Sequence, residues 1–87
     1  MLTDEEIKGK ILHKLTRRGK FEHSHTAIEF LQKGFPKDLI GKVKDMIKEL
    51  KKEGILLSKP TVSGEHISIN LDKIDEVMRY IDIFIKK

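Results

Sequence analysis

The sequence predicts a mainly α-helical fold with one small β-hairpin, an α+β class, and three observations indicate it. Residues 36–53 repeat apolar side chains at the spacing of one helical face. Directly after this segment, two short runs at 55–59 and 65–69 flank a turn sequence, Pro60 to Gly64, as the strands of a hairpin do. Helical periodicity then returns over residues 71–85.

The first helix is expected over residues 4–18. Thr3 and Glu6 have the spacing of a capping box, in which each side chain accepts a hydrogen bond from the backbone N–H of the other residue. Arg18 complements the negative end of the helix dipole, and Gly19 supplies the left-handed residue that commonly ends a helix. The buried face would carry Ile7, Ile11, Leu12 and Leu15.

The next segment predicts a short strand and a short helix. Residues 20–23 suit a strand that turns Phe21 toward the core. A second helix is expected over 25–33, because Thr26 and Glu29 have capping-box spacing.

The connection to the following helix is short. Gly34 ends the second helix, and Pro36 opens the third at a position where a missing N–H costs nothing. A short helix joined so tightly to a long one forms a helix-turn-helix, whose second member can enter a DNA major groove. Asn70 is suited to cap the last helix. The order helix, short strand, helix, helix, strand, strand, helix is that of a winged helix-turn-helix, in one domain of residues 1–87.

Composition narrows the classes of protein that fit. The 87 residues include no cysteine, which excludes disulfides, thiolate metal sites and cysteine nucleophiles. The sequence contains neither a secretory signal nor an apolar run of membrane length, so we expect a cytoplasmic protein. Lys, Glu and Ile dominate, a composition typical of hyperthermophiles, and we expect a thermophilic archaeal source.

The positive charge is unevenly distributed. The formal net charge is +4, and residues 1–59 hold 14 Lys/Arg against 9 Asp/Glu, whereas residues 60–87 hold 4 against 5. The predicted helix-turn-helix lies in the positive part, which favours a polyanion such as nucleic acid as the partner.

The outer face of the predicted helix 36–53 is lined with lysines, which indicates contact with double-stranded DNA. No arginine, whose planar fork suits guanine, lies on this helix, so we expect mainly phosphate contacts and moderate to low sequence specificity. Gly41 interrupts the lysines: either DNA or a neighbouring helix approaches closely there, or the glycine is simply tolerated. The residues expected to contact DNA are Ser24, His25, Thr26, Lys37, Asp38, Gly41, Lys42, Lys44, Lys48, Lys52 and Lys59.

These residues have different expected roles. Residues 24–26 would bind a phosphate at the start of the second helix. Lys42 and Asp38 would contact bases, and Lys59 would be the contact made by the wing. The salt-sensitive affinity would come from Lys37, Lys44, Lys48 and Lys52.

Two stretches resemble the winged-helix superfamily, and more closely a group of small archaeal winged-helix proteins of unassigned function. They read RGKFEHSHTAIEFLQKGFPKDLIGKV, from Arg18, and KPTVSGEHISINLDKIDEV, from Lys59. Proteins of this group often have Asn-Pro where this chain has Asn70-Leu71, and leucine is acceptable at the first helical position. The resemblance implies a winged-helix fold and DNA binding, with regulation of transcription as the default role.

A different class of function remains open, a winged helix that binds another protein. Asp38, Asp45 and Glu49 flank the lysines and would dilute their potential near DNA, and Glu65 in the wing would repel phosphate. The apolar C-terminal helix offers a surface for a homodimer, with Val77, Ile81 and Phe84 as the expected interface.

The sequence gives no indication of an enzyme. We find no Ser/His/Asp arrangement, glycine-rich phosphate loop or paired-carboxylate pocket. His23 and His25 lie on one short segment, but the spacing of the histidines falls short of a metal-binding motif. We therefore expect no catalytic residue, no metal and no cofactor.

Overall fold

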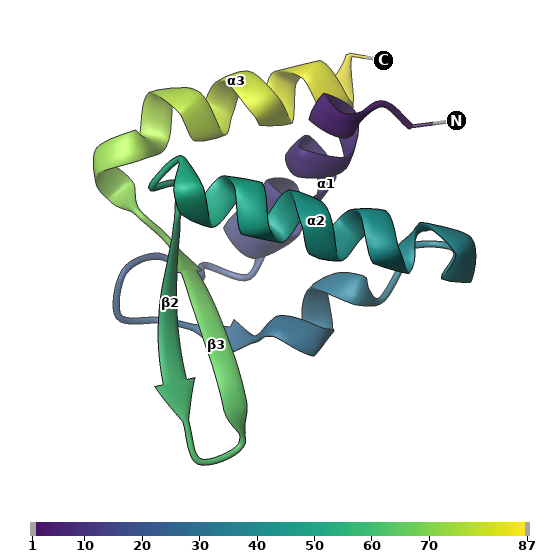
Figure 1. The fold of residues 1–87 in the computed structure, drawn as a ribbon. Coiled ribbons are helices and arrows are strands. Elements are labelled where there is room, and N and C mark those ends of the chain that lie inside the picture. Colours follow the sequence, from purple (N-terminus) through teal and green to yellow (C-terminus); the bar gives the residue numbers. More distant parts are fainter. Residues whose placement is uncertain (1, 87) are drawn as a thin grey trace.

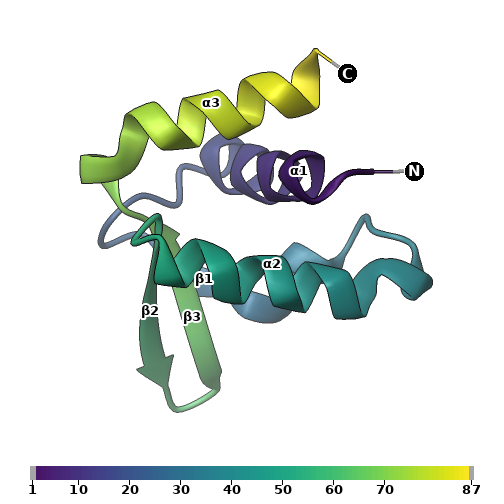
Figure 2. The same cartoon turned by 45° about the horizontal axis from the view of Figure 1, so that its top comes forward.

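Three α-helices surround one core, and a β-hairpin projects from it (Figure 1). The computed structural model describes residues 2–86. In this range the α-helices are α1 (Asp4–Arg17), α2 (Ile40–Lys52) and α3 (Ile74–Ile85). α1 lies between α3 and α2 and contacts both (Figure 2). The predicted α+β class is confirmed, and the order of elements is compatible with a winged-helix layout.

The sheet has three antiparallel strands in the order β1-β3-β2. They are β1 (Thr26–Ala27), β2 (Leu56–Thr61) and β3 (Gly64–Ile69). The hairpin turn is only Val62-Ser63, because both strands extend further toward the tip than predicted. Pro60 is tolerated in β2 because β2 is an edge strand.

The segment before α2 differs most from its prediction. Thr26 is paired with Ile67 of β3, so its backbone belongs to the sheet and cannot open a helix. The helix expected over 25–33 is wrong in its first turn and its type, since only Ile28–Gln32 is helical, as the 3₁₀ helix η1, and no side chain caps it. The strand expected over 20–23 is reduced to one bridge, between Phe21 and Ile69.

Local signals fixed most helix ends as predicted. Thr3 and Glu6 form the capping box, with N···O distances of 2.8 and 3.1 Å, and Gly19 follows α1 with a φ of 66°. Gly54 follows α2 with a φ of 76°. Asn70 accepts a hydrogen bond of 3.0 Å from the N–H of Asp72. Both later helices begin with a 3₁₀ turn, η2 (Lys37–Leu39) before α2 and η3 (Leu71–Lys73) before α3, so their α-helical parts start later than expected.

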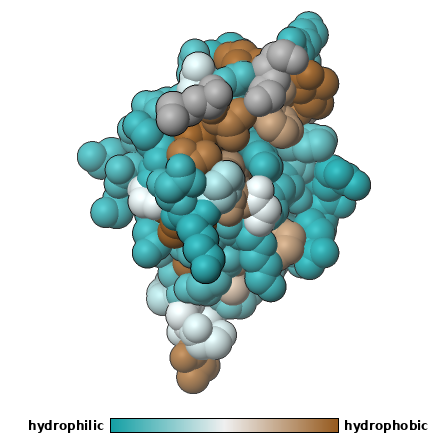
Figure 3. Space-filling model, turned by 90° about the vertical axis from the view of Figure 1, so that its right-hand side faces the viewer, coloured by the Kyte–Doolittle hydropathy of each residue, from teal (hydrophilic) through white to brown (hydrophobic). Residues whose placement is uncertain are grey.

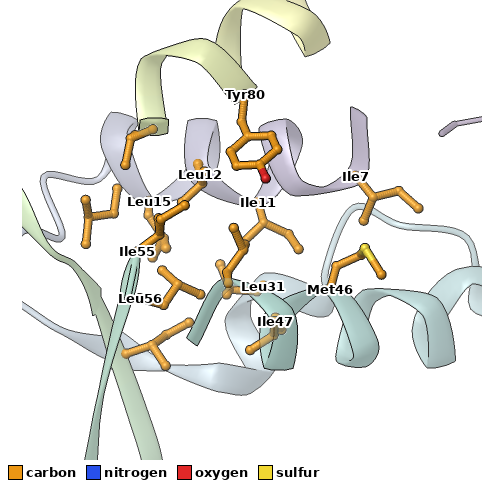
Figure 4. Close-up of a cluster of buried hydrophobic side chains, with 14 of the residues drawn as sticks. Ile7, Ile11, Leu12, Leu15, Leu31, Met46, Ile47, Ile55, Leu56 and Tyr80 are labelled. Atoms are coloured by element: carbon orange, nitrogen blue, oxygen red, sulfur yellow. The ribbon is translucent and has the colours of Figure 1, made fainter. Parts of the chain in front are cut away.

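The core is formed by apolar side chains from all three α-helices, η1 and the hairpin (Figure 4). Its fully buried members include Ile7, Ile11, Leu12, Leu15, Leu31, Ile47, Leu50, Ile55, Ile67 and Ile69. The buried face predicted for the first helix, Ile7, Ile11, Leu12 and Leu15, is therefore confirmed. The apolar face of the last helix is buried only in part, because Leu71, Met78 and Ile85 are exposed.

α1 and α3 touch at a glycine. A Cβ atom added to Gly9 would lie 2.2 Å from the carbonyl oxygen of Tyr80 and 2.7 Å from Cβ of Phe84. No side chain fits in that space, so Gly9 sets how closely the two helices approach. Gly41, on α2, is the opposite case, because an added Cβ would meet no heavy atom within 4 Å.

Beside Gly9, the buried Lys8 joins all three α-helices. Its Nζ lies 2.9 Å from Glu49 and 2.8 Å from Glu53, and Glu53 also accepts a hydrogen bond of 2.8 Å from the hydroxyl of Tyr80. Burial disfavours the charged form of Lys8, but the hydrogen bonds to Glu53 and Glu49 outweigh it and raise the pKa of Lys8. For Glu53, burial is likewise outweighed by the bonds from Lys8 and Tyr80, which lower the pKa of this carboxyl.

We expect substitution by alanine to have opposite effects on stability at Gly9 and at Gly41. Gly9→Ala should lower the free energy of unfolding by about 1–3 kcal/mol, because the new methyl group forces α1 and α3 apart. Gly41→Ala should raise it by roughly 0.5–1 kcal/mol, because alanine favours an exposed helix position. Urea denaturation of both variants measures this, and equal effects at both sites would contradict the close approach at Gly9.

Candidate nucleic-acid interface

The outer face of α2 and of the preceding turn carries lysines that no carboxylate neutralises. Lys37, Lys44, Lys48 and Lys52 are exposed, and among residues 2–86 none of them lies within 4.0 Å of a carboxylate oxygen. The opposite face of α2 is buried in the core through Val43, Met46, Ile47 and Leu50. Packing therefore fixes which way these four lysines project.

Lys42 stands apart from these four. Its Nζ is 3.1 Å from a carboxylate oxygen of Asp4, at the start of α1, and both side chains remain about half exposed. A base contact by Lys42 would have to break this ion pair, whose net contribution to stability is small at such exposure.

The acidic residues beside the lysines dilute their charge less than the sequence suggested. Glu49 shares the ammonium group of the buried Lys8 with Glu53, at 2.9 and 2.8 Å, so its charge is partly neutralised. Asp38 and Asp45 remain exposed, and neither forms an ion pair within the described part of the chain. Among residues 2–86 the face thus holds four unpaired lysines against two unpaired carboxylates and the partly neutralised Glu49.

Glu65, which would repel phosphate at the wing, is also neutralised. Its carboxylate lies 2.6 Å from Nζ of Lys51 and accepts a hydrogen bond from the hydroxyl of Ser58. These bonds, first that of Lys51 and then that of Ser58, hold the pKa of Glu65 below its ordinary value. The tip of the hairpin, at the bottom of Figures 1 and 3, is apolar, and Val62 is fully exposed there.

Residues 24–26 are not at a helix start, so the expected phosphate anchor at a helix N-terminus is absent there. Ser24 lies in an exposed loop and Thr26 in β1. His25 packs against His66 of β3, with their Nδ1 atoms 2.8 Å apart and an angle of 62° between the ring planes. One Nδ1 must donate and the other accept, so only one of these two atoms carries a proton in the bonded pair.

Lys59 lies with this histidine pair and not with the lysines of α2. It is paired in register with His66, so the two side chains share one face of the sheet, whereas Ile67 and Ile69 turn into the core. Lys59, His25 and His66 line a recess of about 140 Å³ on that outer face. The structure therefore divides the predicted contacts between two places, the outer face of α2 and the outer face of the sheet.

The expected dimer residues are mostly internal. Val77 and Ile81 are buried in the core of the single chain. Phe84 is half-buried, with its ring 5.8 Å from that of His13. The apolar side chains that α3 and the turn before it expose are Leu71, Met78 and Ile85, and apolar atoms gather where α3 ends at the top of Figure 3. A second copy that docks on this helix would contact Leu71, Met78 and Ile85. It would not contact Val77 or Ile81, because these two side chains are buried.

A further group of cations was not predicted. Lys14, Arg17 and Arg18, on and just after α1, gather beside the ring of Phe30. Lys10, over the ring of Phe35, and Lys33, after η1, lie close enough to act on the charge of Lys14. One signal in the sequence marks them: residues 7–21 include six Lys or Arg and no Asp or Glu. The interaction of Arg18 with the helix dipole accounts for only one of these six residues.

Comparisons of the chain with protein families, with curated proteins and with solved structures gave no match. Among residues 2–86, no cluster of three or more His, Asp or Glu side chains is placed to hold a metal ion. None of the helices described is long and apolar enough to cross a membrane.

The histidine pair predicts a pH-dependent stability. Burial first, and then the positive charges of His66, Lys59 and Lys20, lower the pKa of His25 below its ordinary value of 6.5. Folding then opposes protonation of His25, so the neutral form of His25 stabilises the fold. This stabilisation is complete above pH 6.5, the ordinary pKa, and is lost as the pH falls through the lowered pKa of the folded protein.

The midpoint of thermal unfolding should therefore fall between about pH 7.5 and about pH 5.5, and His25→Asn should reduce that fall. His23→Asn, at an exposed histidine two residues away, should leave it unchanged and is the control. Identical pH profiles for the wild type and His25→Asn would contradict the effect.

Proposed function

We propose that the chain is a winged-helix protein that binds double-stranded DNA with the outer face of α2, and that it regulates transcription. The observation that carries this proposal is the row of unneutralised lysines on that face, Lys37, Lys44, Lys48 and Lys52. In this reading the hairpin β2-β3 is the wing, and η1 with α2 is the helix-turn-helix.

The arrangement of elements supports the proposal. A short helical segment precedes α2, a hairpin follows it, and a third strand pairs with the inner strand of the hairpin. In helix-turn-helix proteins the second helix of the pair enters the major groove. α2 has one face buried and the other free, as a groove-binding helix requires.

The chemistry would be dominated by phosphate contacts. Each lysine that meets a phosphate releases condensed counterions, so affinity falls steeply with salt. Lysine binds phosphate as a point charge, and α2 carries no arginine to read guanine edges, so discrimination between DNA sequences would be modest. The open space around Gly41 would allow the DNA backbone to approach α2 closely.

A titration of a fluorescent duplex, read by anisotropy at several salt concentrations, tests the proposal. The double variant Lys44→Gln/Lys48→Gln should weaken binding by about tenfold or more and should lower the slope of log affinity against log salt by about 2. Both lysines are exposed and unpaired, so the fold should not change.

The matched control is Lys73→Gln/Lys86→Gln, which removes the same charge from the opposite ends of the η3–α3 segment. It should affect binding much less. Absence of binding at low salt, or equal losses in the two double variants, would refute the assignment of α2 as the DNA-contacting element.

One observation favours a protein partner as the second candidate. A recess of about 350 Å³ lies between η1 and α2, with Ile28 and Ile47 among its lining residues and Lys44 and Lys48 beside them. Lys51, Glu29 and Glu65 also line the recess, so an apolar floor with a charged rim of both signs suits an apolar side chain of a partner that has charged neighbours. Loss of DNA binding in the titration would leave this candidate as the function to pursue.

A further inference from the structure

The cations beside Phe30 and Phe35 are here called the α1 cluster, and they are Lys10, Lys14, Arg17, Arg18 and Lys33. They differ from the lysines of α2 in how they are held. Lys14 Nζ and the guanidinium carbon of Arg18 lie 4.8 and 4.4 Å from the centre of the Phe30 ring. Lys10 Nζ lies 4.6 Å from the centre of the Phe35 ring. Aromatic faces attract cations, so these side chains are positioned by the fold.

Backbone carbonyls fix two of the ammonium groups further. Lys10 donates a hydrogen bond of 2.9 Å to the carbonyl oxygen of Gly34, and Lys14 donates one to that of Lys33. Both bonds connect α1 to the loop that follows η1. These bonds already order the side chains of Lys10 and Lys14 in the folded chain. A ligand that binds them therefore loses less conformational entropy.

The α1 cluster forms no ion pair within the described part of the chain. Within residues 2–86, none of its five members lies within 4.0 Å of a carboxylate oxygen. Burial, followed by the positive charges of Lys10, Arg18 and Lys33, lowers the pKa of Lys14. Like charges held together in this way repel one another, and a bound anion would relieve the repulsion.

The cluster also has a shape that an anion can enter. Lys14, Arg17, Arg18 and Phe30 line a recess of about 290 Å³. Two guanidinium groups at the rim offer planar pairs of N–H donors, which match the spacing of phosphate oxygens.

The α1 cluster lies on another side of the molecule from the lysines of α2. Lys8 and Lys10 are two positions apart, which is a rotation of about 200° around the axis of α1. Their side chains therefore point in nearly opposite directions. Lys8 faces α2 through Glu49 and Glu53, and Lys10 therefore points away from that contact. In Figure 1, α2 lies in front of α1.

We propose that the α1 cluster is a second anion site, which binds a run of phosphate groups such as a nucleic-acid backbone or a free polyphosphate presents. A membrane surface fits less well, because peripheral membrane binding combines cations with exposed apolar anchors. Among residues 2–86, the large apolar side chains that are exposed lie on the hairpin, before α3 or on α3: Leu57, Val62, Leu71, Met78 and Ile85. The proposal does not depend on DNA binding by α2.

The test is a titration followed by amide chemical shifts, with sodium tripolyphosphate and, separately, a short DNA duplex as the probes. Tripolyphosphate should shift the amides of residues 10–20 and 30–34. The double variant Arg17→Gln/Arg18→Gln should weaken its binding at least about tenfold, because charge-assisted hydrogen bonds from both guanidinium groups are lost. Lys73→Gln/Lys86→Gln, with the same loss of charge elsewhere, should bind nearly as the wild type does.

The duplex distinguishes the sources of phosphate. Shifts in residues 10–20 that Arg17→Gln/Arg18→Gln abolishes identify a nucleic-acid backbone as the ligand, and a response of this region to tripolyphosphate alone identifies a free polyphosphate. Failure of both probes to shift these amides overturns the proposal, as does equal binding by the arginine variant and the control. Shifts of α2 amides by the duplex report separately on the proposed function, so either site can fail without the other.

Discussion

The ammonium group of Lys8 is enclosed by the carboxylates of Glu49 and Glu53, and Glu53 is held in turn by the hydroxyl of Tyr80. These side chains come from α1, from α2 and its C-terminal cap, and from α3. A buried ion pair contributes little net stability, but loss of one partner leaves an uncompensated charge inside the protein. The bonds can form only when the helices have one particular relative rotation. The direction in which the outer face of α2 points is therefore constrained by Lys8 together with the apolar packing of α2.

Gly9 supplies the close approach that this network needs. With no side chain at this position, the backbone of α3 comes near enough to α1 for Tyr80 to reach Glu53. The close packing at Gly9 and the polar contacts of Lys8, Glu53 and Tyr80 therefore constrain the same arrangement of α1 and α3. This agreement between neighbouring residues is typical of sequences that specify a single arrangement.

Features that depend on near neighbours in the chain could be predicted from the sequence. The capping box at Thr3, the cap at Asn70 and the left-handed glycines after α1 and α2 are each determined by a few adjacent residues. Features that depend on distant residues could not. Thr26 carries a valid helix-start pattern, yet pairing with Ile67 places it in a strand.

The candidate sites show the same limit. Glu49 looks free on a helical wheel, and its partner Lys8 is 41 positions earlier in the chain. The recess at His25 requires His66, and Lys59, predicted as the contact made by the wing, lies beside these histidines because β2 pairs with β3. The α1 cluster needed Phe30 and Lys33 to be brought beside α1, which η1 and its loop do.

Pro60 has a consequence for how this protein can be recognised. In a two-residue hairpin the closing pair, Thr61 and Gly64, exchanges hydrogen bonds, and bonded and non-bonded pairs alternate along the strands. At Pro60 the N–H would thus point outward from the sheet, and proline has none. The other edge, β1, has only two residues. An incoming strand finds little backbone to extend, which protects the sheet from edge-to-edge aggregation and leaves side chains, not main-chain pairing, to select a partner.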